Sequence, residues 1–131
     1  MQLANAPFRI GALRYDLQPG PGYLRIEFAG DVDSIATADA WIEHIEAALR
    51  DHDLSKVLWD SRPANQLPTD VRAHIWAWLE RGEIVKASAI LVHSELLRVS
   101  ANLSGMGTKL VLKSFGQPDE AIGWLCDVKT R

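Results

Sequence analysis

Residues 110–125 read LVLKSFGQPDEAIGWL, and they contain a complete junction between a strand and a helix. The apolar start of this stretch predicts a strand over 110–115. Pro118 suits the first turn of a helix, and the acidic pair Asp119–Glu120 is favourable beside the positive end of the helix dipole. A helix over 118–128 is therefore expected. Its apolar stripe, which should pack on a sheet, comprises Ala121, Trp124, Leu125 and Val128.

The chain before this junction alternates between strand-like and helix-like patterns. Residues 8–17 and 23–29 are rich in β-forming residues, and the run 18–22 between them has the prolines and glycines of a turn, so the pair predicts an antiparallel hairpin. Further strands are expected over 56–59 and 87–92. The expected helices between the strands run over 33–51, from Pro68 or Thr69 to a stop at Gly82, and over 95–103. The expected N-caps are Asp33 or Ser34 for the first of these helices and Thr69 for the second.

The resulting order of elements, ββαβαβαβα, predicts an α/β fold. Strands that are joined through a helix favour parallel pairing. The fold should therefore contain a single mixed β-sheet, with an antiparallel N-terminal hairpin, parallel later strands and about four helices packed on it. With 131 residues, the chain has the length of one ordinary domain, and we expect residues 1–131 to form a single domain.

Composition and charge argue against several classes of function. The formal net charge of -3 at pH 7 gives no broad basic field for binding nucleic acid. The sequence shows no secretory signal and no apolar run of about 18 residues, so we expect no membrane span and a cytoplasmic protein. The single cysteine, Cys126, excludes an internal disulfide, and we interpret it as a small hydrophobe in a helix.

No motif points to a metal or a cofactor. The four histidines lack the spacing that places two metal ligands on one face of a helix. The glycine-containing run 104–109 resembles a phosphate loop only superficially, because a helix is expected before it and a strand after it. We therefore expect no metal site and no cofactor, and we interpret 104–109 as a helix stop and a turn.

The run 110–125 also resembles the ending of the SpoIIAA-like proteins, a bacterial family of the STAS-like superfamily that is related in fold to the CRAL-TRIO lipid-binding domains. In that family a late strand delivers a Phe, a short acidic turn follows, and the last helix carries an Ala and a Trp-Leu pair, which resemble Phe115, Ala121 and Trp124–Leu125 here. The order of elements also agrees over 23–125. The resemblance implies a SpoIIAA-like fold, and a fold alone does not fix an activity.

Some STAS proteins antagonise anti-sigma factors, and in these a strand ends in an Asp-containing turn while the next helix begins at an Asp-Ser-Ser-Gly motif that a partner kinase phosphorylates. Asp60 resembles the first acidic position. Residues 68–71, Pro-Thr-Asp-Val, replace the motif, so the usual phosphorylatable site is missing. Thr69 keeps a hydroxyl there, and Asp70 has about half of the charge of a phosphate. The sequence leaves open whether Thr69 is phosphorylated.

The stretch 57–70, VLWDSRPANQLPTD, is the candidate site. We interpret it as an ordered loop in which Asp60 accepts loop N–H bonds and pairs with Arg62, with or without a binding role. A small hydrolase that uses Asp60 and Ser61 is the least favoured alternative. Ser61 has no Gly-x-Ser-x-Gly elbow, and no histidine lies in an order that suggests a catalytic triad.

Five tryptophans are an unusual number for this length. Trp59, Trp78 and Trp124 fit buried faces of their elements. Trp41 and Trp76 lie beside the main apolar stripes, so either is a candidate for lining a pocket or a subunit interface.

The sequence favours a non-catalytic STAS-like regulatory or binding module and not an enzyme. It is expected to bind an unidentified protein partner or a small apolar ligand, and a homodimer is compatible with this role. The alternative is a lipid or hydrophobic-ligand carrier, because the helix that contains Trp76 and Trp78 could wall a cavity. The candidate binding residues are Asp60, Ser61, Arg62, Thr69, Asp70 and Trp76.

Overall fold

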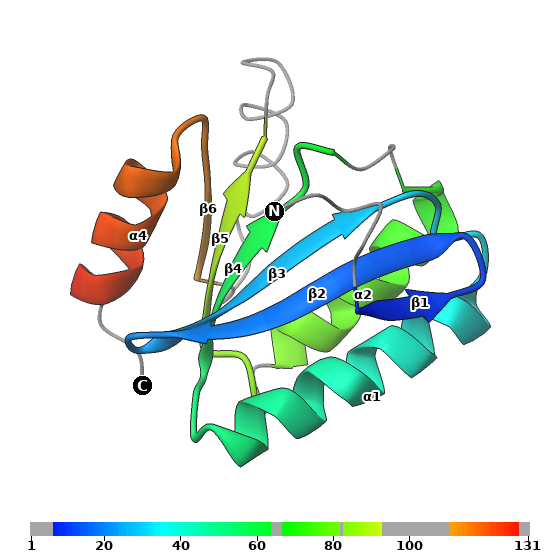
Figure 1. Cartoon of the computed structure of the whole chain (residues 1–131), viewed down its shortest axis with the longest axis horizontal. Coiled ribbons are helices and arrows are strands. Elements are labelled where there is room, and N and C mark those ends of the chain that lie inside the picture. Colours follow the sequence, from blue (N-terminus) through cyan, green and yellow to red (C-terminus); the bar gives the residue numbers. More distant parts are fainter. Residues whose placement is uncertain (1–6, 64–66, 82, 93–110, 129–131) are drawn as a thin grey trace.

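The computed structural model describes residues 7–63, 67–81, 83–92 and 111–128. These residues contain six strands and three helices (Figure 1). The strands are β1 (Phe8–Ile10), β2 (Leu13–Gly20), β3 (Tyr23–Ala29), β4 (Lys56–Asp60), β5 (Ala87–Leu91) and β6 (Leu112–Phe115). The helices are α1 (Ile35–Asp51), α2 (Thr69–Arg81) and α4 (Pro118–Asp127). The helix expected over 95–103 and the turn expected over 104–109 lie outside the described residues.

The strands form one sheet in which they lie side by side in sequence order. β1, β2 and β3 pair antiparallel, whereas β3, β4, β5 and β6 pair in parallel. α1 connects β3 to β4, and α2 connects β4 to β5, which is the crossover that parallel pairing requires. The predicted mixed sheet, with antiparallel strands at the N-terminus and parallel strands after them, is confirmed.

The N-terminal strands differ from the prediction in two respects. The strand expected over 8–17 is broken at Gly11, whose φ of +57° turns the chain between β1 and β2. The turn expected over 18–22 is shorter, because β2 continues to Gly20, which pairs with Tyr23 of β3. Only a Pro–Gly pair remains between these partners, and this pair suits a tight two-residue turn.

The helices lie on both faces of the sheet, with α1 and α2 on one face and α4 on the other (Figure 1). The core under α1 and α2 is the larger one and contains most of the aromatic rings. On the α4 face, Ala121 and Leu125 are buried, and the partly buried ring of Trp124 packs against Phe115. The predicted stripe of α4 is confirmed. Cys126 lies in α4, as the prediction of a helical position requires, and its side chain is exposed.

Two polar contacts fix the ends of helices. The hydroxyl of Ser34 accepts the backbone N–H of Thr37 at 3.2 Å, which satisfies a free donor at the start of α1. At the end of α4, Nζ of Lys56 donates to the carbonyl oxygens of Leu125 and Val128 at 2.7 and 3.0 Å. Lys56 is the first residue of β4, so this cation joins the sheet to the negative end of the helix.

Candidate functional site

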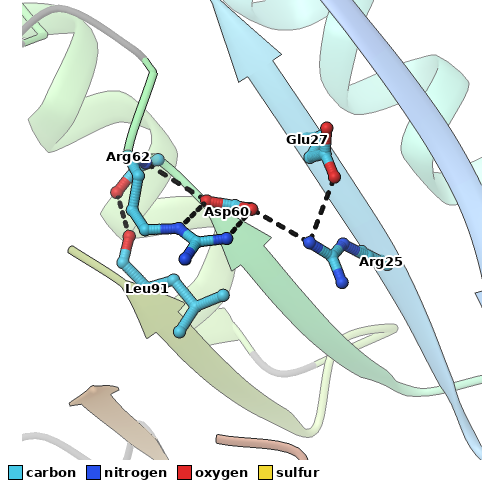
Figure 2. Close-up of polar contacts among 6 residues, drawn as sticks. Arg25, Glu27, Asp60, Arg62 and Leu91 are labelled. Atoms are coloured by element: carbon cyan, nitrogen blue, oxygen red, sulfur yellow. Dashed lines mark hydrogen bonds and ion pairs between the residues drawn. The ribbon is translucent and has the colours of Figure 1, made fainter. Parts of the chain in front are cut away.

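The candidate site is centred on Asp60, the last residue of β4 (Figure 2). Only 4% of its side chain is exposed. Arg62 donates to its carboxylate from the backbone N–H at 3.3 Å, from Nε at 2.9 Å and from Nη2 at 2.8 Å. Nη2 of Arg25 donates to the same carboxylate at 3.0 Å. The predicted pairing of Asp60 with Arg62 and with a loop N–H is therefore confirmed.

The register between β3 and β4 brings two further charges to Asp60. Glu27 lies opposite Asp60 in the parallel pair, and Arg25 is two residues earlier on the same face of the sheet. Nη2 of Arg25 also forms an ion pair with Oε1 of Glu27 at 3.1 Å. The four side chains thus alternate in charge in the order Glu27, Arg25, Asp60 and Arg62 (Figure 2).

Sequence reasoning missed Arg25 and Glu27. Both occupy polar positions of an alternating strand, which is the signal that places them on one face. Their contact with Asp60 depends on the register between β3 and β4. The alternation of polar and apolar residues within one strand does not determine that register.

The environment of Asp60 keeps its carboxylate ionised. Burial raises the pKa of Asp60, but the hydrogen bonds and charge of Arg62, with the charge of Arg25, outweigh burial and lower the pKa below its ordinary 3.8. The bond to Asp60 in turn raises the pKa of Arg62. A carboxylate held in this way is a poor proton acceptor at neutral pH, because its oxygens already accept bonds from two cations.

Ser61 joins the ends of two neighbouring strands. Its backbone N–H and its hydroxyl both donate to the carbonyl oxygen of Leu91, at 3.2 and 2.6 Å. Leu91 is the last residue of β5, so these bonds tie the end of β4 to the end of β5. The hydroxyl proton of Ser61 points to a backbone carbonyl and not to a side-chain base.

A hydrolase at this site would need a histidine beside Asp60 and Ser61. His74 of α2 is instead bonded through Nε2 to Oδ1 of Asp39 on α1, at 2.6 Å. Trp59 packs in the core under α1 and α2, and because strand side chains alternate, Asp60 points to the opposite face of the sheet. His74 therefore does not serve Asp60. His93 lies outside the described residues.

Thr69 and Asp70 lie at the start of α2, and both are exposed. The backbone N–H of Arg72 donates to the carbonyl oxygen of Pro68 at 2.9 Å, so the first helical turn already contains Thr69. The interpretation of Thr69 as the N-cap is therefore wrong, because Pro68 occupies the cap position. In the described part of the chain, no hydrogen bond or ion pair joins Thr69 or Asp70 to Asp60.

The two tryptophans proposed to contact a ligand or a partner lie in different surroundings. Trp41 is 1% exposed and packs against the rings of Phe28 and Trp59, with centroid distances of 4.9 and 5.6 Å. It is a core residue, so its assignment to a pocket or an interface is wrong. Trp76 is half-buried on α2, and its contact with a ligand or a partner stays a prediction.

No three side chains among the histidines, cysteines and acidic residues described here gather closely enough to hold a metal ion. Within the described ranges, no helix has both the length and the apolar character needed to cross a membrane.

Comparison with known proteins gives matches in structure but not in sequence: no protein-family model matches the chain, and no curated protein does. An uncharacterized protein of the DUF3478 family with a SpoIIAA-like fold, from Shewanella loihica, is similar with a TM-score of 0.66 and 18% identity, over 93% of this chain and 100% of that one. An anti-sigma factor antagonist from Mycobacterium paratuberculosis is similar with a TM-score of 0.61 and 15% identity, over 88% and 95%. The anti-sigma factor antagonist SpoIIAA, in its unphosphorylated form, is similar with a TM-score of 0.60 and 12% identity, over 87% and 99%.

Identities of 12 to 18% establish a shared fold and nothing finer. Each similarity extends over at least 87% of this chain. The structural comparisons agree with the resemblance that residues 110–125 carry in the sequence. The chain therefore has a SpoIIAA-like fold of the STAS-like type.

Proposed function

We propose that the chain is a single-domain, non-catalytic regulatory module that acts in the cytoplasm by binding a protein partner. The proposed binding region, the β4–α2 surface, consists of Asp60, Ser61, Arg62, Thr69, Asp70 and Trp76. Two of the similar solved structures are anti-sigma factor antagonists, which supports a regulatory role through a protein partner.

The observation that carries this proposal is that the guanidinium of Arg62 is both fixed in orientation and partly exposed. Two nearly parallel bonds to Asp60 hold it in one orientation, while 35% of its side chain is exposed. A partner that contacts this group has fewer rotamers to immobilise than it would with a free arginine, so less conformational entropy opposes binding. A fixed and accessible cation is suited to recognising a carboxylate or a backbone carbonyl of another protein.

The start of α2 supplies the second part of the surface. Thr69 and Asp70 are exposed there, and Asp70 has a negative charge close to the helix N-terminus. The surface therefore offers a cation and an anion, a pattern that selects a partner of complementary charge. Because the Asp-Ser-Ser-Gly motif is missing, we propose that binding does not depend on phosphorylation of a serine at this position.

The non-catalytic part of the proposal rests on how the polar groups of the site are used. The hydroxyl of Ser61 is bonded to a backbone carbonyl, and the carboxylate of Asp60 is shared between two arginines. Both groups serve the architecture of the loop, which supports a binding role over a chemical one.

The experiment that tests the proposal is quantitative co-purification of the tagged full chain from its own host. The wild-type chain should retain a specific protein, and Arg62→Gln should reduce its recovery because the fixed cation is lost. Arg81→Gln is the matched control, since Arg81 is an exposed arginine in the last turn of α2, outside the β4–α2 surface. If Arg62→Gln, Thr69→Ala and Asp70→Asn all recover the partner as the wild type does, the β4–α2 surface is not the binding region.

A further inference from the structure

Four aromatic rings form a continuous series in the core on the α1–α2 face of the sheet. They belong to Trp78 of α2, Trp59 of β4, Trp41 of α1 and Tyr15 of β2. Successive ring centroids lie 6.4, 5.6 and 6.0 Å apart. None of the four residues is more than 7% exposed. Neighbouring rings are therefore in contact across the whole core, from α2 to the N-terminal part of the sheet.

The polar atoms of this series have different surroundings. The hydroxyl of Tyr15 lies 2.7 Å from Nδ1 of His44 on α1. Burial raises the pKa of Tyr15, so the phenol keeps its proton, and its hydroxyl lies within hydrogen-bond distance of the imidazole. Nε1 of Trp41 is buried without a hydrogen-bond partner among the described residues. An unpaired buried N–H is unfavourable, and a phenylalanine at this position would avoid it.

We infer that this series carries a one-electron oxidation from Trp78 to Tyr15, where it ends as a tyrosyl radical. A small one-electron oxidant of the azide-radical class takes one electron from Trp78 and is reduced to its anion. Electrons then move in turn from Trp59, from Trp41 and finally from Tyr15, so that each indole is restored. As Tyr15 gives up its electron, its hydroxyl proton crosses to Nδ1 of His44. The products are the reduced anion, a neutral tyrosyl radical and an imidazolium ion.

Proton acceptors determine where the oxidation ends. An aromatic ring that loses an electron becomes acidic at its O–H or N–H, and a base within hydrogen-bond distance stabilises the radical by taking the proton. Trp41 has no acceptor in the described part of the chain, and Nε1 of Trp59 faces only a neutral hydroxyl at 3.3 Å. Nε1 of Trp78 faces Glu46 at 3.4 Å, which is longer than the contact between Tyr15 and its imidazole. The oxidation therefore passes through the indoles and ends at Tyr15.

The test is pulse radiolysis of the full chain with azide radical, followed by optical absorption and freeze-quench electron paramagnetic resonance. The partly buried Trp76 and Trp124 lie outside the series and are replaced by phenylalanine in every sample. The expected result is a tryptophan radical that converts to a tyrosyl radical in a first-order step whose rate does not depend on protein concentration. If the tryptophan radical decays without forming a tyrosyl radical, the inference is overturned.

The chain provides a matched pair of tyrosines that identifies the final site. Tyr15→Phe should abolish the tyrosyl signal, whereas Tyr23→Phe should keep it, because Tyr23 packs in the separate core on the α4 face. Trp59→Phe should slow the conversion by interrupting the series, with circular dichroism used to show that each variant is folded. A tyrosyl signal that survives Tyr15→Phe but is lost in Tyr23→Phe, or a rate unchanged in Trp59→Phe, contradicts the assigned path. The outcome is independent of partner binding at the β4–α2 surface.

Discussion

At the scale of single residues, the main feature is a buried carboxylate that two arginines share. Asp60 loses its hydration at the end of β4, and four hydrogen bonds from Arg25 and Arg62 replace it. Such a cluster stabilises the fold only while all its members are present, because each isolated charge would be costly to bury. The same bonds that keep Asp60 ionised also orient the exposed part of Arg62, so stability and the proposed binding depend on one set of contacts.

Replacing Asp60 with Asn is expected to lower the free energy of unfolding by about 2 kcal/mol, because Arg25 and Arg62 lose their buried counter-charge. Urea denaturation monitored by circular dichroism measures the change. Asp39→Asn is the control. Asp39 also contacts a nitrogen-bearing side chain, His74, but 61% of the Asp39 side chain is exposed, so a change of about 0.5 kcal/mol or less is expected. Equal losses in the two variants would show that the buried cluster has no special role.

The stability that Asp60 provides should depend on pH in a defined direction. Because the folded pKa of Asp60 is lower than its ordinary value of 3.8, its contribution is fully present above pH 3.8 and is lost as the pH falls through the folded pKa. The difference in unfolding free energy between the wild type and Asp60→Asn should therefore shrink below pH 3.8. Urea titrations at a series of pH values test this. A difference that stays constant in acid would contradict the lowered pKa.

At the scale of elements, two contacts set the positions of helices on the sheet. Gly30 connects β3 to the segment before α1, with φ of +85° and no room for a side chain, since a Cβ there would lie 2.1 Å from the carbonyl oxygen of Ala12. On the α4 face of the sheet, Lys56 donates hydrogen bonds to the last carbonyl oxygens of α4. One contact is steric and the other is electrostatic, and they can be tested separately.

Gly30→Ala is expected to destabilise the chain by about 3 kcal/mol or more, because it adds a clash with backbone to an unfavourable positive φ. Gly22→Ala is a matched control, since Gly22 has φ of +88° but open space around the added Cβ, and it should cost only about 1–2 kcal/mol. Thermal or urea unfolding of the two variants separates the steric term from the conformational one. If both variants lose the same stability, the close approach to Ala12 is not important.

Lys56→Met should loosen α4, because two carbonyl oxygens at its C-terminal end lose a cationic donor. We expect a loss of about 1.5 kcal/mol and faster amide hydrogen exchange in α4 than in α1. Lys113→Met, at an exposed position of β6, removes the same charge without touching the end of α4 and should leave that exchange unchanged. Faster exchange in both variants, or in neither, would refute the role assigned to Lys56.

At the scale of the whole molecule, the predictable features were those that local chemistry determines. The helix start at Pro118, a cap at Asp33 or Ser34 and the pairing of Asp60 with Arg62 all follow from neighbours in sequence, and the structure agrees, with Ser34 as the cap. The contact of Arg25 with Asp60 spans 35 residues and depends on strand register, so no local pattern contains it. The surroundings of Trp41 were predicted wrongly for a related reason, because they also depend on residues distant in sequence.

The apolar stripe of α1 is wide and includes Trp41 beside Ile42 and Ile45. A narrower stripe, predicted from helical spacing alone, leaves Trp41 outside. The ring then meets aromatic residues from β3 and β4, Phe28 and Trp59, whose positions depend on the packed sheet. A core of this kind is a property of the assembled layers and not of any single segment.

The central claim is that this chain regulates by binding a protein, and native mass spectrometry of the full chain purified gently from its own host tests it most directly. One spectrum reports the masses of retained proteins, small ligands and covalent modifications together. The account predicts the chain in complex with a protein partner and without a retained apolar ligand. A chain that instead carries a stoichiometric lipid or other hydrophobic molecule, with no protein partner, would contradict the account and establish a carrier.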